Sequence, residues 1–145
     1  MLIRDILQFN KDKYFDGAVQ ANWFYDADKV AAIADSYVFH GPKYHGVDKT
    51  EQTSYTLYDT ATYAYELYKK SQETQSNRFQ MTIAGYGTGK SHLSAALAAF
   101  LSGHDDTLRQ IVLKNIAAAD RTIGTAMSDY SGKNLMIVLN GMRDF

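Results

Sequence analysis

A short stretch of the chain, from Gly85 to Ser91, combines the residue types that bind phosphate groups. Phosphate carries concentrated negative charge, and backbone N–H groups can surround it only where the chain curls tightly. Glycines permit that curl, Lys90 brings an ammonium group to the outer phosphates, and the Ser91 hydroxyl is suited to Mg²⁺. We therefore predict a nucleotide-phosphate site in which Lys90 is the catalytic residue and Ser91 the metal ligand. The predicted nucleotide-binding residues are Gly85, Tyr86, Gly87, Thr88, Gly89, Lys90, Ser91 and His92.

The sequence on either side of the loop predicts a strand before it and a helix after it. The run FQMTIA, residues 79–84, is short and β-prone, whereas KSHLSAALAAFL is typical of a helix. This order is the context that the pattern G-x-x-x-x-G-K-[ST] requires, although Ala84 stands where the strict pattern has glycine. The alternative is a glycine-rich turn between strand and helix that happens to precede a lysine.

The segment GYGTGKSHL resembles the Walker A segment of AAA+-like (ASCE) P-loop ATPases, including helicase loaders and the large ATPases of bacterial phage-defence loci such as BREX. The resemblance covers about residues 79–102. It implies binding of ATP and Mg²⁺, phosphate contacts from Gly87, Thr88, Gly89, Lys90 and Ser91, and remodelling of DNA or a protein partner, often by a homo-oligomer. His92 and Leu93 belong to the resemblance more than to the chemistry.

The acidic residues that such ATPases use for hydrolysis are not evident after the loop. The later candidate strand, residues 134–140, ends at Asn140 and Gly141, and Asp144 lies four residues further on. We therefore expect the acidic strand to lie beyond Phe145, in a longer protein. The alternatives are a regulatory or scaffold module that binds nucleotide without hydrolysing it, and a small P-loop kinase.

The predicted fold class is α/β. Residues 78–145 would form the start of a P-loop NTPase core, with parallel strands and flanking helices, preceded by a mixed α/β region and linker at 1–77. Local signals predict further helices with aspartate caps and a glycine end. The predicted elements are a helix at 2–8, a strand at 19–25, a helix to Ser36 capped by Asp26 or Asp28, strand and turn at 37–47, a helix at 60–75 capped by Asp59, a helix end at Gly103, and helical residues 107–127 capped by Asp105 or Asp106 and broken near Gly124.

Composition limits the classes of function. The 145 residues have a formal net charge of -1, so no basic field announces nucleic acid, and DNA is neither indicated nor excluded. The chain has no cysteine, which excludes disulfides and thiol nucleophiles and favours a cytoplasmic protein. No apolar run approaches the roughly 20 residues needed to span a bilayer, so we expect no membrane partner.

Other chemical residues have simpler explanations. His40 and His45 flank a turn but lack further metal ligands. Asp105 and Asp106, beside His104, suit a helix cap. The tyrosine stripe at 58, 65 and 68 should pack against the sheet or near Trp23, although residues 60–75 or 37–44 are alternatives for covering an adenine base. Arginine fingers are a further alternative at Arg109, Arg121 and Arg143.

Overall fold

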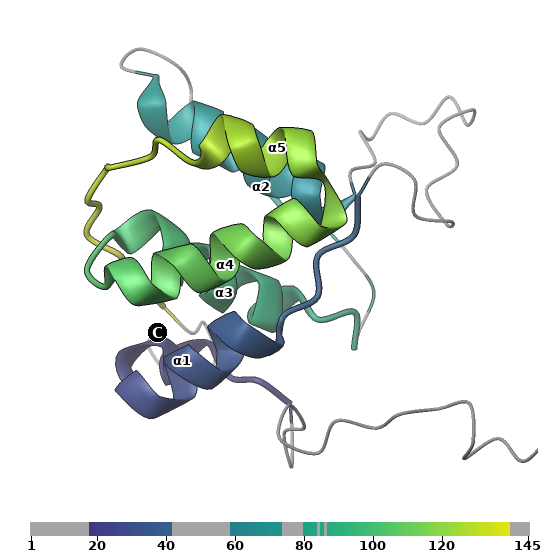
Figure 1. Cartoon of the computed structure of the whole chain (residues 1–145). Helices are drawn as coiled ribbons and strands as arrows, with labels where there is room; N and C mark the ends of the chain where they lie inside the picture. Colours follow the sequence, from purple (N-terminus) through teal and green to yellow (C-terminus); the bar gives the residue numbers. More distant parts are fainter. Residues whose placement is uncertain (1–17, 42–58, 74–79, 84, 86, 140–145) are drawn as a thin grey trace, which may run out of the picture.

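The computed structural model describes residues 18–41, 59–73, 80–83, 85 and 87–139, and these form a helical assembly (Figure 1). Helix α3 contacts α1, α2, α4 and η3, while α4 also contacts α1 and α5. In Figure 1, α1 lies on one side of the α3–α4 pair, and α2 and α5 lie on the other. The elements are the 3₁₀ helix η3 (Ala21–Tyr25) and the α-helices α1 (Ala27–Ser36), α2 (Thr60–Gln72), α3 (Lys90–Ser102), α4 (Asp106–Ala119) and α5 (Arg121–Met127).

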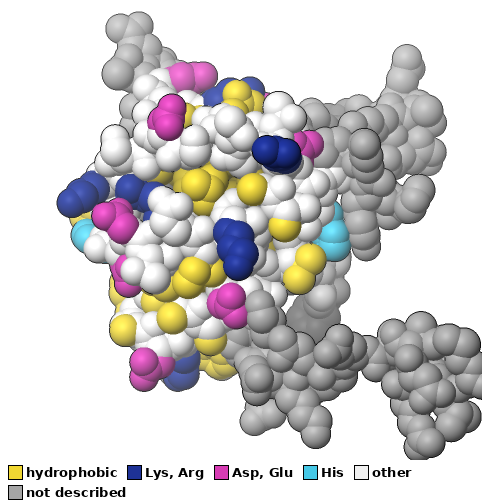
Figure 2. Space-filling view, viewed as in Figure 1, with side chains coloured by type: hydrophobic (Ala, Val, Ile, Leu, Met, Phe, Trp, Pro, Cys, Tyr) yellow, Lys and Arg dark blue, Asp and Glu magenta, His cyan; other side chains and the backbone are white. Residues whose placement is uncertain are grey.

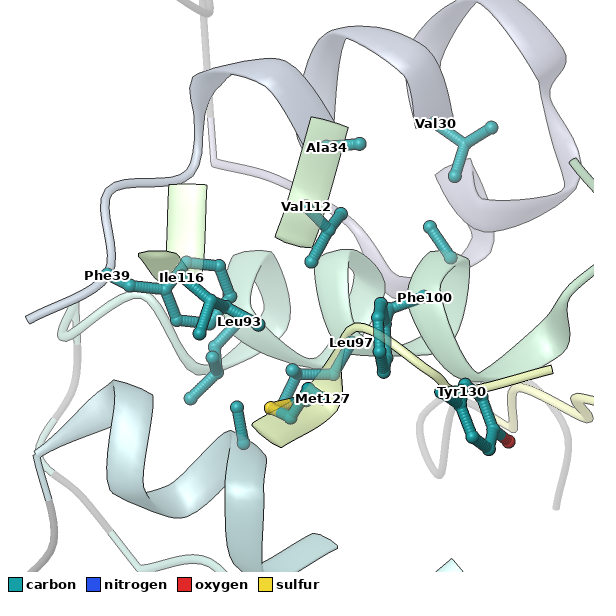
Figure 3. Packing of buried hydrophobic residues seen from close by; sticks show 12 residues of the cluster. Val30, Ala34, Phe39, Leu93, Leu97, Phe100, Val112, Ile116, Met127 and Tyr130 are labelled. Carbon is teal, nitrogen blue, oxygen red and sulfur yellow. The ribbon is translucent and has the colours of Figure 1, made fainter. Parts of the chain in front are cut away.

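Helix α3 is central because it is apolar on nearly all sides. Eight of its thirteen residues are buried, as expected of a helix with neighbours all round. Many of these residues are alanines, which favour the helix and keep its surface narrow enough for close neighbours. Leu93, Leu97 and Phe100 supply the bulk of its contribution to the core (Figure 3).

The neighbouring helices cover α3 with single apolar stripes. In α4 the buried residues Arg109, Val112 and Ile116 recur at helical spacing and therefore lie on one face. The apolar residues buried between these helices come from both sides of the predicted domain boundary at 77/78, and that boundary stays a prediction. The members of the buried cluster are Val30, Ala34, Phe39, Ala64, Leu93, Leu97, Ala99, Phe100, Val112, Ile116, Met127 and Tyr130 (Figure 3).

Aspartate caps set the starts of four helices. The side chains of Asp26, Asp59 and Asp105 accept hydrogen bonds from first-turn N–H groups of α1, α2 and α4, which confirms these predicted caps. Asp120 does the same for α5. Gly103 ends α3 in the left-handed conformation, with φ 62°, as predicted.

The predicted α/β core is wrong, because the described residues form helices and no strand. Both candidate core strands fail in their described parts, residues 80–83 and 134–139. The apolar run expected to be buried in a sheet is largely exposed instead: Leu135, Ile137 and Leu139 are 82%, 68% and 64% exposed.

The hydrogen bonds of these two segments explain the difference. A strand needs a neighbouring strand to satisfy its backbone groups. Asn134 instead donates its N–H to the Ser102 carbonyl at the end of α3 (3.2 Å), and Val138 donates to the Tyr25 hydroxyl (2.8 Å). Thr82 contacts the Tyr63 hydroxyl of α2 through its own side chain. Helices and side chains thus take the place of a sheet.

Three smaller predictions also change. Residues 21–25, expected in a strand, form η3, and the described residues 37–41 contain no strand. The break in 107–127 falls at Asp120 and not at Gly124. Gly124 lies inside α5. A Cβ there would approach the Ala117 Cβ to 2.5 Å, so glycine permits close packing on α4. The predicted helix at 2–8 lies outside the described residues.

The tyrosines of α2 pack against the end of α3 and not near Trp23. Tyr68 stacks on Tyr65 and meets Tyr130 edge to face, with ring centroids 6.0 and 5.5 Å apart. Tyr130 in turn stacks on the buried Phe100 at 5.3 Å. These contacts confirm a packing role for Tyr65 and Tyr68, whereas Tyr58 lies outside the described residues.

Candidate phosphate-binding loop

The loop before α3 depends on two glycines in a left-handed conformation. Gly87 has φ 73° and Gly89 has φ 80°, a region that residues with a Cβ rarely occupy. A Cβ built on either residue meets no atom within 4 Å, so the space beside the loop is open. The glycines are therefore required by the backbone shape and not by crowding.

The side chains of the loop converge on one carbonyl. The Thr88 hydroxyl donates to the Gly85 carbonyl oxygen at 2.8 Å, and the Lys90 ammonium donates to the same oxygen at 2.5 Å. The Gly85 carbonyl thus accepts two hydrogen bonds that close residues 85–90 on themselves. The ammonium group lies over the loop, where an incoming phosphate oxygen would compete with the carbonyl for it.

The N-terminus of α3 differs from those of the other α-helices. Helices α1, α2, α4 and α5 each begin with an aspartate that accepts first-turn N–H groups. Helix α3 begins after Gly89, which offers no side-chain cap, and its first turn contains no acidic residue. The N–H groups and the positive end of the helix dipole at Lys90 are therefore suited to an external anion.

Ser91 lies in the first turn of α3 and is exposed. Ser91 directly follows Lys90, the order that the predicted Mg²⁺ role requires. Within the described residues, no group of three or more His, Cys, Asp or Glu side chains is placed to hold a metal ion. A Mg²⁺ site of the predicted kind instead combines one hydroxyl with phosphate oxygens and water.

The side chain of His92 contacts α1. Its Nε2 atom lies 3.1 Å from the Ile33 carbonyl oxygen and 3.2 Å from the Ser36 hydroxyl. The ring meets Tyr37 edge to face at 4.9 Å. Burial lowers the pKa of His92 below its ordinary value of 6.5, with the Ile33 hydrogen bond acting in the opposite direction. The His92 side chain therefore points toward α1, whereas the Thr88 and Lys90 side chains point toward Gly85.

The remaining predicted residues are distributed as follows. Asp105 caps α4, which confirms the helix-cap interpretation for this residue, whereas Asp106 pairs with Arg109 at 3.4 Å. Arg109 is buried and donates to the Gly132 carbonyl at 2.6 Å, so it does not project toward a neighbouring subunit. Arg121 is exposed. Residues 45, 58, 84, 86, 140, 141, 143 and 144 lie outside the described residues.

The sequence contains a local signal for the uncapped start of α3. Aspartate precedes or begins each of the other four α-helices, and glycine takes that place before Lys90. No comparable signal predicts the contact of His92 with α1, because it depends on how two helices pack.

Comparison of the chain with known protein families, with curated proteins and with solved structures found no match. Within the described residues, none of the helices combines the length and the apolar character needed to cross a bilayer. Lys, Arg, Asp and Glu side chains are interspersed over the face drawn in Figure 2, in keeping with the near-zero net charge of -1.

Proposed function

We propose that this chain binds the phosphate groups of ATP, with Mg²⁺, at the loop Gly85–Ser91. The observation that carries the proposal is the combination at one helix start of two left-handed glycines, a lysine over the loop and no side-chain cap. Each feature favours an anion, and together they provide backbone N–H groups, a helix dipole and a full positive charge.

Lys90 has the main electrostatic role in this proposal. Its ammonium group donates to the Gly85 carbonyl, and on nucleotide binding it would exchange that partner for the outer phosphates. Thr88 and the glycines shape the loop, and Ser91 supplies its hydroxyl to Mg²⁺. The preference for ATP over other nucleoside triphosphates follows from the resemblance to AAA+-like ATPases.

Hydrolysis and a biological role are proposed on the resemblance alone. On that basis the ATP energy remodels DNA or a protein partner, with a homo-oligomer as the working form and phage defence as the setting, and the absence of cysteine favours the cytoplasm. A module that binds nucleotide without turnover has the same loop. Phosphate release measured alongside binding would establish turnover by this chain, against the expectation that the acidic hydrolysis residues lie outside it.

Titration of the full chain with a fluorescent ATP analogue and Mg²⁺ tests the binding proposal. A charged hydrogen bond contributes about 1.5–3 kcal/mol, so Lys90→Ala should weaken binding roughly 10- to 100-fold. Lys114→Ala is the matched control, because Lys114 is exposed on α4 and removes the same charge elsewhere. Equal affinity of wild type and Lys90→Ala, or equal losses in both variants, would contradict a specific site at the loop.

A further inference from the structure

The His92 ring is held between α3 and α1 by contacts on several sides. Its Nε2 atom is 3.1 Å from the Ile33 carbonyl oxygen, and because a carbonyl only accepts, Nε2 carries the hydrogen of this bond. The Ser36 hydroxyl lies 3.2 Å from the same nitrogen. The Tyr37 ring packs edge to face against the imidazole and also against Phe39, with centroid distances of 4.9 and 4.7 Å. The imidazole therefore has one well-defined position.

The acceptor of this bond lies at the end of α1. The Ile33 carbonyl also accepts the N–H of Tyr37 at 3.2 Å and the hydroxyl of Ser36 at 3.4 Å. Ile33 itself is fully buried, so this carbonyl belongs to a rigid part of the molecule. A bond from His92 to it ties the first turn of α3 to the last turn of α1.

His92 and Lys90 lie on different sides of the same helical turn. Two residues along an α-helix correspond to about 200° of rotation, so a side chain that faces α1 leaves the Lys90 side chain on nearly the opposite face. This matches the contacts: His92 meets Ile33, whereas Lys90 reaches back to Gly85. Fixing one face of the turn thereby fixes the backbone from which the Lys90 side chain extends on the other face.

We propose that His92 is a positioning residue for the phosphate loop, and that its contact with α1 transmits loop occupancy to the α1–α3 interface. The proposal rests on the proposed ATP binding at Gly85–Ser91. His92 touches no phosphate in this account. It holds the first-turn N–H groups and the Lys90 backbone in place through the helix, and any adjustment of that turn on binding moves the groups against which His92 packs.

The chain contains its own reporter of this interface. Trp23 is the only tryptophan, and it packs against the buried group formed by Ile33, Ala95 and Ala96, which joins α1 to α3. The ammonium of Lys29 lies 5.3 Å from the centre of the indole ring. Ile33 belongs to the group that Trp23 packs against, and its carbonyl accepts the His92 hydrogen bond. A shift of the first turn of α3 therefore changes the surroundings of the indole.

The test measures tryptophan emission and ATP affinity on the full chain, in wild type, His92→Ala, His92→Gln and His104→Ala. Glutamine keeps an N–H donor at a similar reach. His104 is an exposed histidine near the other end of α3 and serves as the matched control. Thermal melting of each variant identifies any that is unfolded.

The expected result is an ATP-dependent change in Trp23 emission that His104→Ala retains. His92→Ala should weaken ATP binding roughly three- to tenfold, the effect of one lost hydrogen bond, and remove the emission change at saturating ATP. His92→Gln should restore both, which mere loss of a packing side chain would not explain.

Several results would overturn the proposal while leaving the binding proposal intact. One is normal ATP affinity and a normal emission change in folded His92→Ala, with Lys90→Ala still defective. Another is a folded His92→Gln that shows neither affinity nor emission above His92→Ala. If His92→Ala does not fold, His92→Gln against wild type decides alone: matching values support the hydrogen bond, and a full loss in folded protein refutes it. Absence of ATP binding by wild type would refute both proposals.

Discussion

Replacing Gly89 with alanine tests the backbone conformation on which the loop depends. Gly89 has φ 80° and ψ 17°, and a Cβ in this left-handed region costs about 1–2 kcal/mol. An alanine Cβ would meet no atom within 4 Å, so the cost comes from the backbone and not from a clash. The substitution therefore changes one quantity, the free energy of the left-handed conformation.

The size of the effect on binding depends on whether the free loop or the ATP-bound loop carries this strain. Gly89 is exposed, so the free loop can relax into another conformation when alanine is present. Bound phosphates would hold the left-handed form, and the bound state then carries the strain. Because about 1.4 kcal/mol is a tenfold change in affinity, Gly89→Ala should bind ATP roughly 5- to 30-fold more weakly than wild type.

Gly89→Asn is the matched control in the same titration with a fluorescent ATP analogue. Asparagine adopts the left-handed conformation more readily than alanine, and its Cβ would also meet no atom within 4 Å. Gly89→Asn should therefore bind ATP more tightly than Gly89→Ala. Wild-type affinity in Gly89→Ala, or an equal loss in Gly89→Asn, would refute the argument that the left-handed turn is needed for binding.

Two further predictions concern the metal and the far end of α3. Ser91→Ala should lose the part of the ATP affinity that wild type loses when Mg²⁺ is chelated, whereas Ser94→Ala, exposed on the same helix, should keep it; a Mg²⁺ effect unchanged by Ser91→Ala would contradict the metal role. Gly103→Ala should lower the free energy of unfolding in urea by roughly 3–5 kcal/mol, the left-handed strain plus a lost charged hydrogen bond. The reason is that its Cβ would come within 1.9 Å of the Arg109 Nη2 atom and 2.4 Å of the Gly132 carbonyl oxygen. A loss near zero would show that Arg109 is not held as described.

Helix starts could be predicted from the sequence because their causes are local. Asp26, Asp59 and Asp105 each accept N–H groups only two or three residues away, so the chain needs no tertiary partner to express the signal. The same holds for Gly103, whose left-handed conformation ends α3.

The strands could not be predicted in the same way, since a strand depends on partners that are distant in sequence. The apolar pattern at 134–139 is compatible with a buried strand, but Val138 finds its partner in the Tyr25 hydroxyl, 113 residues away. Arg109 shows the same limit. The sequence alone was compatible with Arg109 as an exposed arginine finger. Its burial results from the approach of Gly132 and Tyr130.

The candidate site was predictable in its residue types and only partly in its geometry. Glycine, lysine and serine spacing indicated a phosphate loop, and the left-handed Gly87 and Gly89 have the conformation that such a loop needs. The convergence of Thr88 and Lys90 on Gly85, and the turn of His92 toward α1, depend on helix packing. Nucleotide binding itself stays a prediction.

The most direct test of phosphate binding at the loop is an ATP titration of isotope-labelled chain followed by backbone amide NMR signals. The account predicts that the largest shifts on adding Mg²⁺ and ATP fall on the amides of Gly87, Thr88, Gly89, Lys90 and Ser91, and that Lys90→Ala reduces them. No shift at these amides, or larger shifts on α4 and α5 than on the loop, would contradict it.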